Sequence, residues 1–319
     1  MNIVYTIDAV REQVKAWKQA GLSVGYVPTM GFLHEGHASL MKQARQDNDK
    51  VVVSIFVNPT QFGPTEDLDS YPRDLDHDSD LCESMGVDLI FHPEPSEMYV
   101  DPKAYVNIVG LSDHLCGATR PIHFKGVCTV VSKFFNIVTP DRAYFGQKDA
   151  QQLAIIRKMV CDLNIPVTIV GVPIVREQDG LAKSSRNTYL NDAERKAATV
   201  LYKSVLSGQT YLQEQAKTSP NIVVSSQSVL DVMTAVINEE PLAKIDYVSV
   251  VDALTMEPVE TIDRDVLVAM AVYIGKTRLI DNFSYAVDRA GNAHEMRIHG
   301  ATNTVNANDE QAVNASVNK

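Results

Sequence analysis

The first half of the chain alternates between two patterns of apolar residues. Helical spacing predicts a helix from Thr6, as its N-cap, to Gly21, where it ends. Short apolar runs, typical of strands buried on both faces, follow at 23–30, 51–57, 88–93, 142–146 and 166–175. Helical patterns separate these runs, starting near Gly36 and then at 75–86, 123–138 and 149–164. Such alternation predicts an α/β fold in which a parallel sheet is covered by helices.

The pattern changes after residue 175. Helical patterns come first and consecutive strands follow, at 192–217, 226–238, 244–252, 266–274 and 277–283. We therefore expect a doubly wound, Rossmann-like domain at 1–175 and a smaller α+β C-terminal domain at 176–285. Residues 286–319 are rich in Asn, Ala and scattered charge, which predicts a disordered tail.

Composition narrows the class of protein. The chain has 319 residues, of which 45% are apolar and 22% charged, as in an ordinary globular protein. Its net charge of -11 argues against nucleic acid as a partner. Four cysteines without CxxC pairing suggest neither a disulfide framework nor a zinc-thiolate site. We find no signal-peptide pattern and no apolar run long enough for a membrane span, so we expect a cytoplasmic protein that acts on small molecules.

The segment PTMGFLHEGHASL, at 28–40, leads from a buried strand into a helix. His34 and His37 stand three residues apart where the helix begins. Free backbone N–H groups and the positive end of the helix dipole make this position suitable for a nucleotide phosphate. A metal site is a weaker alternative, because HEGH lacks the HExxH spacing and no third ligand is evident. Incidental surface histidines are the other alternative.

Two further polar segments follow predicted strands. FVNPTQF places Asn58 and Gln61 at the carboxyl end of a strand, where open α/β sheets bind ligands, and neutral amides there could hold a hydroxy acid. Turn formation would also explain the Asn-Pro pair, but not Gln61. GQKD places Lys148 and Asp149 at the start of another helix. Lys148 is a candidate for binding phosphate oxygens, whereas Asp149 could accept from a ribose hydroxyl or simply cap the helix.

The segment DGLAKSSRN gathers Lys183, Ser184, Ser185 and Arg186 into one polar loop. Such a loop could close over a triphosphate and stabilise departing pyrophosphate, or it could be a solvated linker. An acidic run from Glu66 to Asp80 holds seven carboxylates, which we interpret as a solvated helix face rather than a magnesium site.

Taken together, these segments resemble one family. PTMGFLHEGH is similar to the HIGH-type signature of the nucleotidyltransferase superfamily, and DGLAKSSRN is similar to its KMSKS-type loop. With FVNPTQF and RPIHFKGVCTVVSKFFNIVTPDRAYFGQKDAQQL, the match narrows to the pantothenate synthetase family over residues 1 to about 285. The resemblance implies condensation of (R)-pantoate with β-alanine, driven by cleavage of ATP to AMP and pyrophosphate with Mg²⁺, through a pantoyl-adenylate. It also implies a homodimer.

The resemblance assigns roles to residues at matching positions. It implies an ATP site lined by Met30, Gly31, Phe32, Leu33, His34, Glu35, Gly36, His37, Gly146, Gln147, Lys148, Asp149, Val175, Lys183, Ser184, Ser185 and Arg186. It implies that Gln61 and Gln152 bind pantoate or β-alanine. The residues expected to act in catalysis are His37, the family's usual acid, with His34, Lys148, Ser184, Ser185 and Arg186. Any metal is expected to bind through the ATP phosphates rather than directly to the protein.

Some features of the match stay open. Arg120 and His123 match a family segment near the active site, but no step is assigned to them. The family usually has methionine where this chain has Lys183, so loop dynamics or ATP affinity could differ. Two other functions are alternatives: an adenylyltransferase that keeps AMP in its product, and a non-catalytic ATP sensor. A transfer-RNA ligase is a poor fit to a short, acidic chain.

Overall fold

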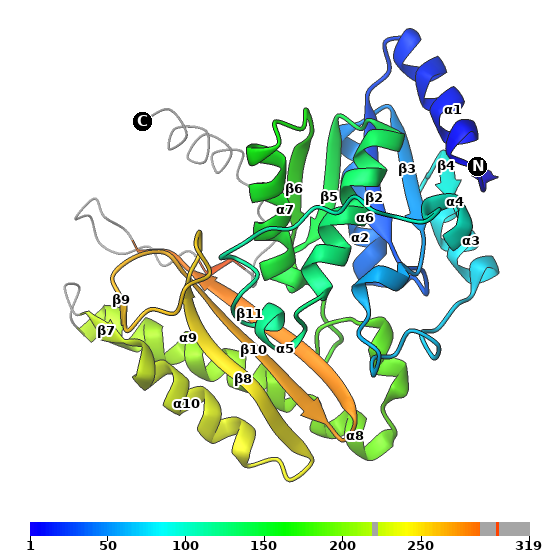
Figure 1. The fold of residues 1–319 in the computed structure, drawn as a ribbon. Coiled ribbons are helices and arrows are strands. Elements are labelled where there is room, and N and C mark those ends of the chain that lie inside the picture. Colours follow the sequence, from blue (N-terminus) through cyan, green and yellow to red (C-terminus); the bar gives the residue numbers. More distant parts are fainter. Residues whose placement is uncertain (219–222, 288–297, 300–319) are drawn as a thin grey trace.

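The computed structural model describes residues 1–218, 223–287 and 298–299. Figure 1 shows two layered parts, a parallel sheet with helices on both faces and an antiparallel sheet packed beside it. Among the helices of the described ranges, none combines the length and the apolar character that crossing a bilayer requires. The four cysteines are free thiols.

The first part is a six-stranded parallel sheet with the order β1-β4-β3-β2-β5-β6. Its strands are β1 (Asn2–Val4), β2 (Val24–Thr29), β3 (Lys50–Ile55), β4 (Leu89–Phe91), β5 (Arg142–Gly146) and β6 (Thr168–Val172). The order reverses between the neighbours β2 and β5, because the chain runs outward from β2 in one direction and from β5 in the other. In open α/β sheets, a crevice at the carboxyl ends of the strands at such a switch point is where ligands bind.

Helices cover both faces of this sheet. One face packs against α1 (Ile7–Gln19), α6 (His123–Val138) and α7 (Ala150–Asp162), and the other against α2 (Glu35–Asp47) and α3 (Leu75–Ser84). Alternation within β3 explains the two cores, because Val52 belongs to the first and Val51 and Val53 to the second. Short helical segments link these elements, namely η1 (Pro59–Gln61), α4 (Pro95–Met98), α5 (Cys116–Thr119) and η2 (Gln147–Asp149).

The second part contains an antiparallel sheet with the order β12-β11-β10-β8 and a small pair, β7-β9. The strands are β7 (Val224–Ser225), β8 (Ala243–Asp252), β9 (Thr261–Ile262), β10 (Val266–Ile274), β11 (Thr277–Tyr285) and β12 (Ile298–His299). The helical segments are η3 (Ser185–Tyr189), α8 (Asp192–Ala197), α9 (Val200–Thr218) and α10 (Ser226–Asn238).

Both faces of the antiparallel sheet are covered. Helices α9 and α10 pack on one face, as Figure 1 shows, and share a core with β10 residues such as Val268 and Met270. On the other face, Leu267 and Ala269 pack with Leu115 and with Ala150 of α7. This second cluster therefore joins the antiparallel sheet to α7 and to the segment around Leu115 of the first part.

The expected α/β class, with its parallel sheet and smaller α+β part, is confirmed. The sequence patterns missed the two- and three-residue strands β1, β7, β9 and β12, which are too short to show a period. The division at residue 175 stays a prediction. Ile298–His299, within the segment expected to be a disordered tail, pairs with β11 as β12. The disorder of the tail stays a prediction. Residues 288–297 and 300–319 lie outside the described residues.

Candidate active site

The turn after β2 is held in an unusual conformation. Gly31 and Phe32 both have positive φ, at 86° and 50°, a region that favours glycine. A Cβ on Gly31 would approach a carboxylate oxygen of Asp78 to 3.0 Å. The same carboxylate accepts the backbone N–H groups of Phe32 at 2.9 Å and Leu33 at 2.6 Å. Asp78 from α3 therefore fixes the path of the chain into α2.

Helix α2 begins with an N-terminal cap made of two imidazoles. His34 is the N-cap residue, and its Nδ1 accepts from the backbone N–H of Gly36 at 3.1 Å. Nδ1 of His37 accepts in turn from the backbone N–H of His34 at 3.2 Å. The ring centroids lie 4.1 Å apart. This is the reciprocal arrangement of a capping box, with histidines in place of the usual Ser and Glu.

These hydrogen bonds determine what the two rings can do. Because each Nδ1 is an acceptor, the neutral ring carries its proton on Nε2, which is then the available donor. Burial, followed by the charge of Lys148, lowers the pKa of His34 to about 4. Burial, then His34 and Lys148, lowers the pKa of His37 well below its ordinary value. Without a ligand, both rings are therefore neutral donors near pH 7.

Lys148 lies in η2, directly after β5, the strand that neighbours β2 in the sheet. Its ammonium group is near enough to lower the pKa of both His34 and His37. Among the described residues, no carboxylate forms an ion pair with Lys148. Asp149 is at the N-cap position of α7, but its side chain makes no capping hydrogen bond, so the alternative that it simply caps this helix is wrong. Lys148 therefore offers a positive charge beside two imidazole donors.

The Ser184–Arg186 segment packs against the turn after β2. The Ser185 hydroxyl donates to the carbonyl of Phe32 at 3.1 Å, and Ser184 caps η3 by accepting from the backbone N–H of Arg186. The Arg186 guanidinium forms two hydrogen bonds with Asp67, both 2.9 Å long. The structure thus brings this loop to the start of α2, as a ligand shared between them would require.

Lys183 links the same loop to α2 through two ion pairs. Its Nζ lies 3.1 Å from Glu35, the first residue of α2, and 2.9 Å from Glu177. Hydrogen bonding to Glu177, set against partial burial, gives a net rise in the pKa of Lys183. Lys183 is therefore an ammonium group held by two carboxylates.

The loop begins at Val175, whose carbonyl accepts the backbone N–H of Lys183 at 2.9 Å. Arg176 and Ala182 pair as an antiparallel bridge, so residues 175–183 form a narrow backbone hairpin. Gly180 turns this hairpin at a φ of 92°, where a Cβ would overlap the ring of Tyr202. Val175 is thus the base of the loop that carries Lys183 and Arg186.

Gln61 is buried beside the turn after β2. Its Nε2 lies 3.1 Å from the Met30 sulfur, and its Oε1 accepts from Asn58 at 3.0 Å. Asn58 also donates to the carbonyl of Gly126 in α6, and it caps η1. Asn58 therefore orients Gln61 toward Met30, and these hydrogen bonds give the asparagine a structural role at this turn.

The neighbouring glutamines of α7 have different surroundings. Gln151 is buried and bonds the backbone of residues 111–116, donating to Leu111 and His114 and accepting from Cys116. Gln152 is partly exposed and makes no side-chain hydrogen bond within the described part of the chain. Gln151 thus holds structure, while the Gln152 carboxamide is available to a ligand.

His123 contacts the backbone of Gln61, and Arg120 contacts Glu66 in the segment that follows. Nδ1 of His123 lies 3.1 Å from the Gln61 carbonyl oxygen, and Arg120 forms a bidentate pair with Glu66. Burial, then the charge of Arg120, lowers the pKa of His123 to about 3. Both side chains therefore bind to the segment that carries Gln61 and Glu66 and stabilise it.

The acidic run is solvated only in part, because four of its seven carboxylates are exposed whereas Glu66, Asp67 and Asp78 are not. Helix α3 begins only at Leu75, and the carboxylates before it are engaged by distant cations, Glu66 by Arg120 and Asp67 by Arg186. Asp78 is 1% exposed, and its burial raises its pKa. The partners lie more than forty residues away along the chain, so local spacing gave no sign of these interactions.

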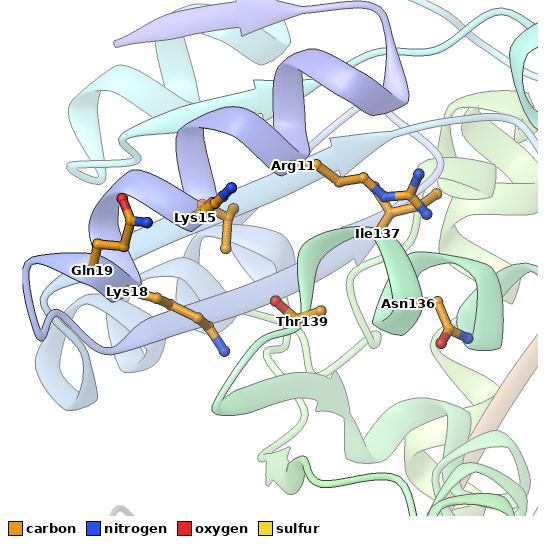
Figure 2. Close-up of a pocket in the computed structure, with 8 residues that line it drawn as sticks. Arg11, Lys15, Lys18, Gln19, Asn136, Ile137 and Thr139 are labelled. Atoms are coloured by element: carbon orange, nitrogen blue, oxygen red, sulfur yellow. The ribbon is translucent and has the colours of Figure 1, made fainter.

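A separate hollow lies elsewhere on the molecule. It has a volume of about 500 Å³ and lies between α1 and the end of α6. Figure 2 shows Arg11, Lys15 and Lys18 of α1 around it, with Ile137 and Thr139 on the opposite side. None of the expected site residues lines this hollow, so its volume says nothing about the edge between β2 and β5.

The doubly wound sheet, with cationic and imidazole groups at its switch point, has the architecture of α/β enzymes that bind nucleotides. The model of the pantoate-β-alanine ligase family matches residues 2–284. The chain belongs to this family and is an enzyme of the ligase class.

Individual relatives agree. The chain is 60% identical to a pantothenate synthetase of Clostridium botulinum (strain Kyoto / Type A2), over 89% of this chain and 99% of that protein. It is 58% identical to the pantothenate synthetase of Enterococcus faecalis, with the same coverage. The structure of the Thermus thermophilus pantothenate synthetase matches with a TM-score of 0.81 and 42% identity, over 88% of this chain and 98% of that one.

One solved relative was crystallised with ligands. The pantoate-β-alanine ligase of Francisella tularensis, described as complexed with β,γ-ATP and β-alanine, matches with a TM-score of 0.70. It is 34% identical, over 89% of this chain and 97% of that one.

Proposed function

We propose that this ligase forms its amide bond in two steps at the edge between β2 and β5. As a member of its family, the chain condenses pantoate with β-alanine using ATP. In the first step, a pantoate carboxylate oxygen attacks the α-phosphorus of ATP, the bond to the bridging oxygen breaks, and pyrophosphate leaves. In the second, the neutral amine of β-alanine attacks the carbonyl carbon of pantoyl-adenylate, AMP leaves, and the amine loses a proton.

The observation that carries this proposal is the juxtaposition of His34, His37 and Lys148. Negative charge accumulates on the phosphates as pyrophosphate leaves, and groups that are positioned beforehand stabilise it without reorganisation. The two Nε2–H groups and the Lys148 ammonium supply such donors beside the N-terminus of α2. No covalent enzyme intermediate is required, so the protein acts through positioning and electrostatics.

His37 also fits the family's usual acid. Its pKa is lowered in the unliganded protein, but a triphosphate beside the ring favours the protonated form and raises that pKa. The imidazole could thus take a proton as ATP binds and donate it toward the leaving phosphate oxygen. In this proposal His34, whose pKa is lowered to about 4 by burial and by the charge of Lys148, stays a neutral donor.

The remaining expected residues fit two subsites. The ATP subsite takes the 30–37 turn, the 146–149 turn and the loop from Val175 to Arg186. We place pantoate at Gln61 and Gln152, because Gln61 lies beside Met30 and Gln152 offers a carboxamide with no partner among the described residues.

Magnesium enters through ATP in this proposal. Within the described residues, no group of three or more His, Cys, Asp or Glu side chains is placed to hold a metal ion. The ion would instead be held by phosphate oxygens, where it neutralises charge on the triphosphate. A homodimer and a cytoplasmic location stay predictions.

The test measures pyrophosphate and AMP release from ATP and Mg²⁺ with (R)-pantoate, in the presence and absence of β-alanine. We expect full turnover only with both substrates, with one free AMP for each pyrophosphate. Free AMP would exclude an adenylyltransferase that keeps AMP in its product. ATP binding by folded protein without pantoate-dependent release would support the sensor alternative and overturn the proposal.

A further inference from the structure

Strand β11 contacts the backbone of the 146–149 turn through one side chain. The Asn282 carboxamide donates to the carbonyl oxygen of Lys148 at 2.8 Å and to that of Gln147 at 3.2 Å. Asn282 is 7% exposed. Both acceptors lie in η2, between the end of β5 and the start of α7, so Asn282 acts on the backbone at Lys148 itself.

Asp281, the preceding residue of β11, forms hydrogen bonds with Arg176 near the start of the Val175–Arg186 loop. Asp281, which is 1% exposed, forms two hydrogen bonds with the Arg176 guanidinium, at 2.7 and 2.9 Å. The guanidinium lies 4.5 Å from the centroid of the Tyr202 ring. An Asp281 carboxylate oxygen also accepts the backbone N–H of Asn282 at 2.8 Å. The two side chains are therefore coupled through one peptide unit.

Successive side chains of β11 point to opposite faces, which explains how Asp281 and Asn282 contact two different segments. Asp281 shares its face with Leu279 and Phe283, which belong to the core with α9. Asn282 points to the other face, toward the parallel sheet. The dipeptide therefore connects the Val175–Arg186 loop, on one side of β11, to the 146–149 turn on the other.

We propose that Asn282 is a positioning residue for Lys148, and that Asp281 sets the Val175–Arg186 loop relative to it through Arg176. This inference rests on the proposed function, since it assumes that Lys148 binds ATP phosphates. Reaction rates are sensitive to displacements of about 1 Å at the reacting groups, which can cost about a hundredfold. A pair of hydrogen bonds to the backbone of Lys148 restricts such displacement.

The variants are Asn282→Asp and Asn282→Ala. Asn282→Asp keeps the shape of the side chain but replaces the N–H donors by an oxygen that faces two carbonyls, so it isolates the hydrogen bonds from packing. Asn136→Ala is a control for loss of an asparagine side chain outside the site, because Asn136 is an exposed residue of α6 that donates to the carbonyl oxygen of Ser132. We expect both Asn282 variants to raise KM for ATP and so to lower kcat/KM for ATP about tenfold, with KM for pantoate changed by less than about twofold. Asn136→Ala should change neither.

A double-mutant cycle with Lys148→Ala separates positioning from general structural support. If Asn282 acts through Lys148, Asn282→Ala should lower kcat/KM for ATP about tenfold in the wild type but less than about twofold in the Lys148→Ala protein. If Asn282→Ala lowers kcat/KM for ATP by the same factor in the wild type and in the Lys148→Ala protein, the proposal is overturned. An Asn282→Asp variant with unchanged kinetics would overturn it as well. Thermal unfolding of each variant shows whether it is folded.

The same four proteins are also compared by the dissociation constant of a non-hydrolysable ATP analogue, which is measured at equilibrium and needs no turnover. If the wild type binds the analogue but releases no pyrophosphate, the proposed function fails while the binding cycle still tests Asn282. If the analogue binds and the Asn282 and Lys148 substitutions weaken binding independently, the positioning role fails while the proposed function stands. An analogue that binds equally well to the wild type and both Asn282 variants also overturns the positioning role.

Discussion

Nδ1 of His37 accepts the backbone N–H of His34 at 3.2 Å, so the residue expected to act as an acid also caps the helix that carries it. The cap uses the acceptor side of the ring and leaves Nε2–H for a ligand. Capping fixes the orientation of both imidazoles before ATP arrives. The geometry of the site and the stability of α2 therefore depend on the same two side chains.

The first prediction concerns stability and pH. The pKa of His34 is about 4 in the folded protein, against 6.5 ordinarily, so between these values the unfolded chain binds more protons. The free energy of unfolding should therefore fall as the pH drops from about 6.5 toward 4. His34→Asn keeps a capping acceptor but does not titrate, and should recover about 1–2 kcal/mol of this loss near about pH 5.

Urea denaturation across this pH range measures the effect. An unchanged slope in His34→Asn would contradict the neutral, buried state of this ring.

The second prediction compares the adjacent glutamines of α7. Gln152→Ala should raise KM for pantoate about tenfold or more with little change in Tm, because its carboxamide bonds no described residue. Gln151→Ala should instead lower Tm, because it leaves two carbonyls and one N–H without their partner. Steady-state kinetics and calorimetry on both variants check this. A stable Gln152→Ala with wild-type KM for pantoate would remove Gln152 from the substrate site.

The third prediction addresses Lys183. Lys183→Met removes both ion pairs, but Glu35 is 67% exposed, so stability should change by less than about 1 kcal/mol. KM for ATP should rise severalfold at low salt while KM for pantoate stays constant, since the ammonium exchanges its carboxylate partners for phosphate.

Glu177→Gln is the companion variant, because it frees Lys183 from its shorter ion pair and should lower KM for ATP. Equal KM values for ATP in the wild type and in Lys183→Met would show that the ammonium stays with its carboxylates throughout turnover.

The fourth prediction concerns Asp78, which holds the turn at Phe32 and Leu33. Asp78→Ala leaves two backbone N–H groups without acceptors and should destabilise the protein by about 2–4 kcal/mol. It should also raise KM for ATP, because the strained turn relaxes. Asp80→Ala, an exposed carboxylate on the same helix, should stay within about 0.5 kcal/mol of the wild type. Chemical denaturation compares the two, and equal stabilities would contradict the role of Asp78.

Much of the fold followed from the sequence, because periodicity reports directly which face of an element is buried. The pattern from His123 to Val138 predicted α6 to the residue, and the continuous apolar run at 51–57 predicted the buried strand β3. The histidine pair at the start of α2 was also predicted from its spacing. These features depend on residues close to one another in the chain.

The rest depends on contacts between distant segments. Nothing near Asp78 indicates that it accepts hydrogen bonds from Phe32, and nothing near Asn282 indicates that it bonds the carbonyl of Lys148. A clue existed for Asn282, since an asparagine in an apolar strand needs a partner when it is buried. Its partner, however, could be identified only from the structure.

The most direct test of the two-step account is the exchange of labelled pyrophosphate into ATP. We expect exchange that requires pantoate and Mg²⁺ but proceeds without β-alanine, because the adenylate forms and reverts before the amine is needed. His37→Ala should slow this exchange more than about tenfold while the protein stays folded. Exchange that is absent without β-alanine, in a protein that turns over when both substrates are present, would contradict a free-standing adenylate step.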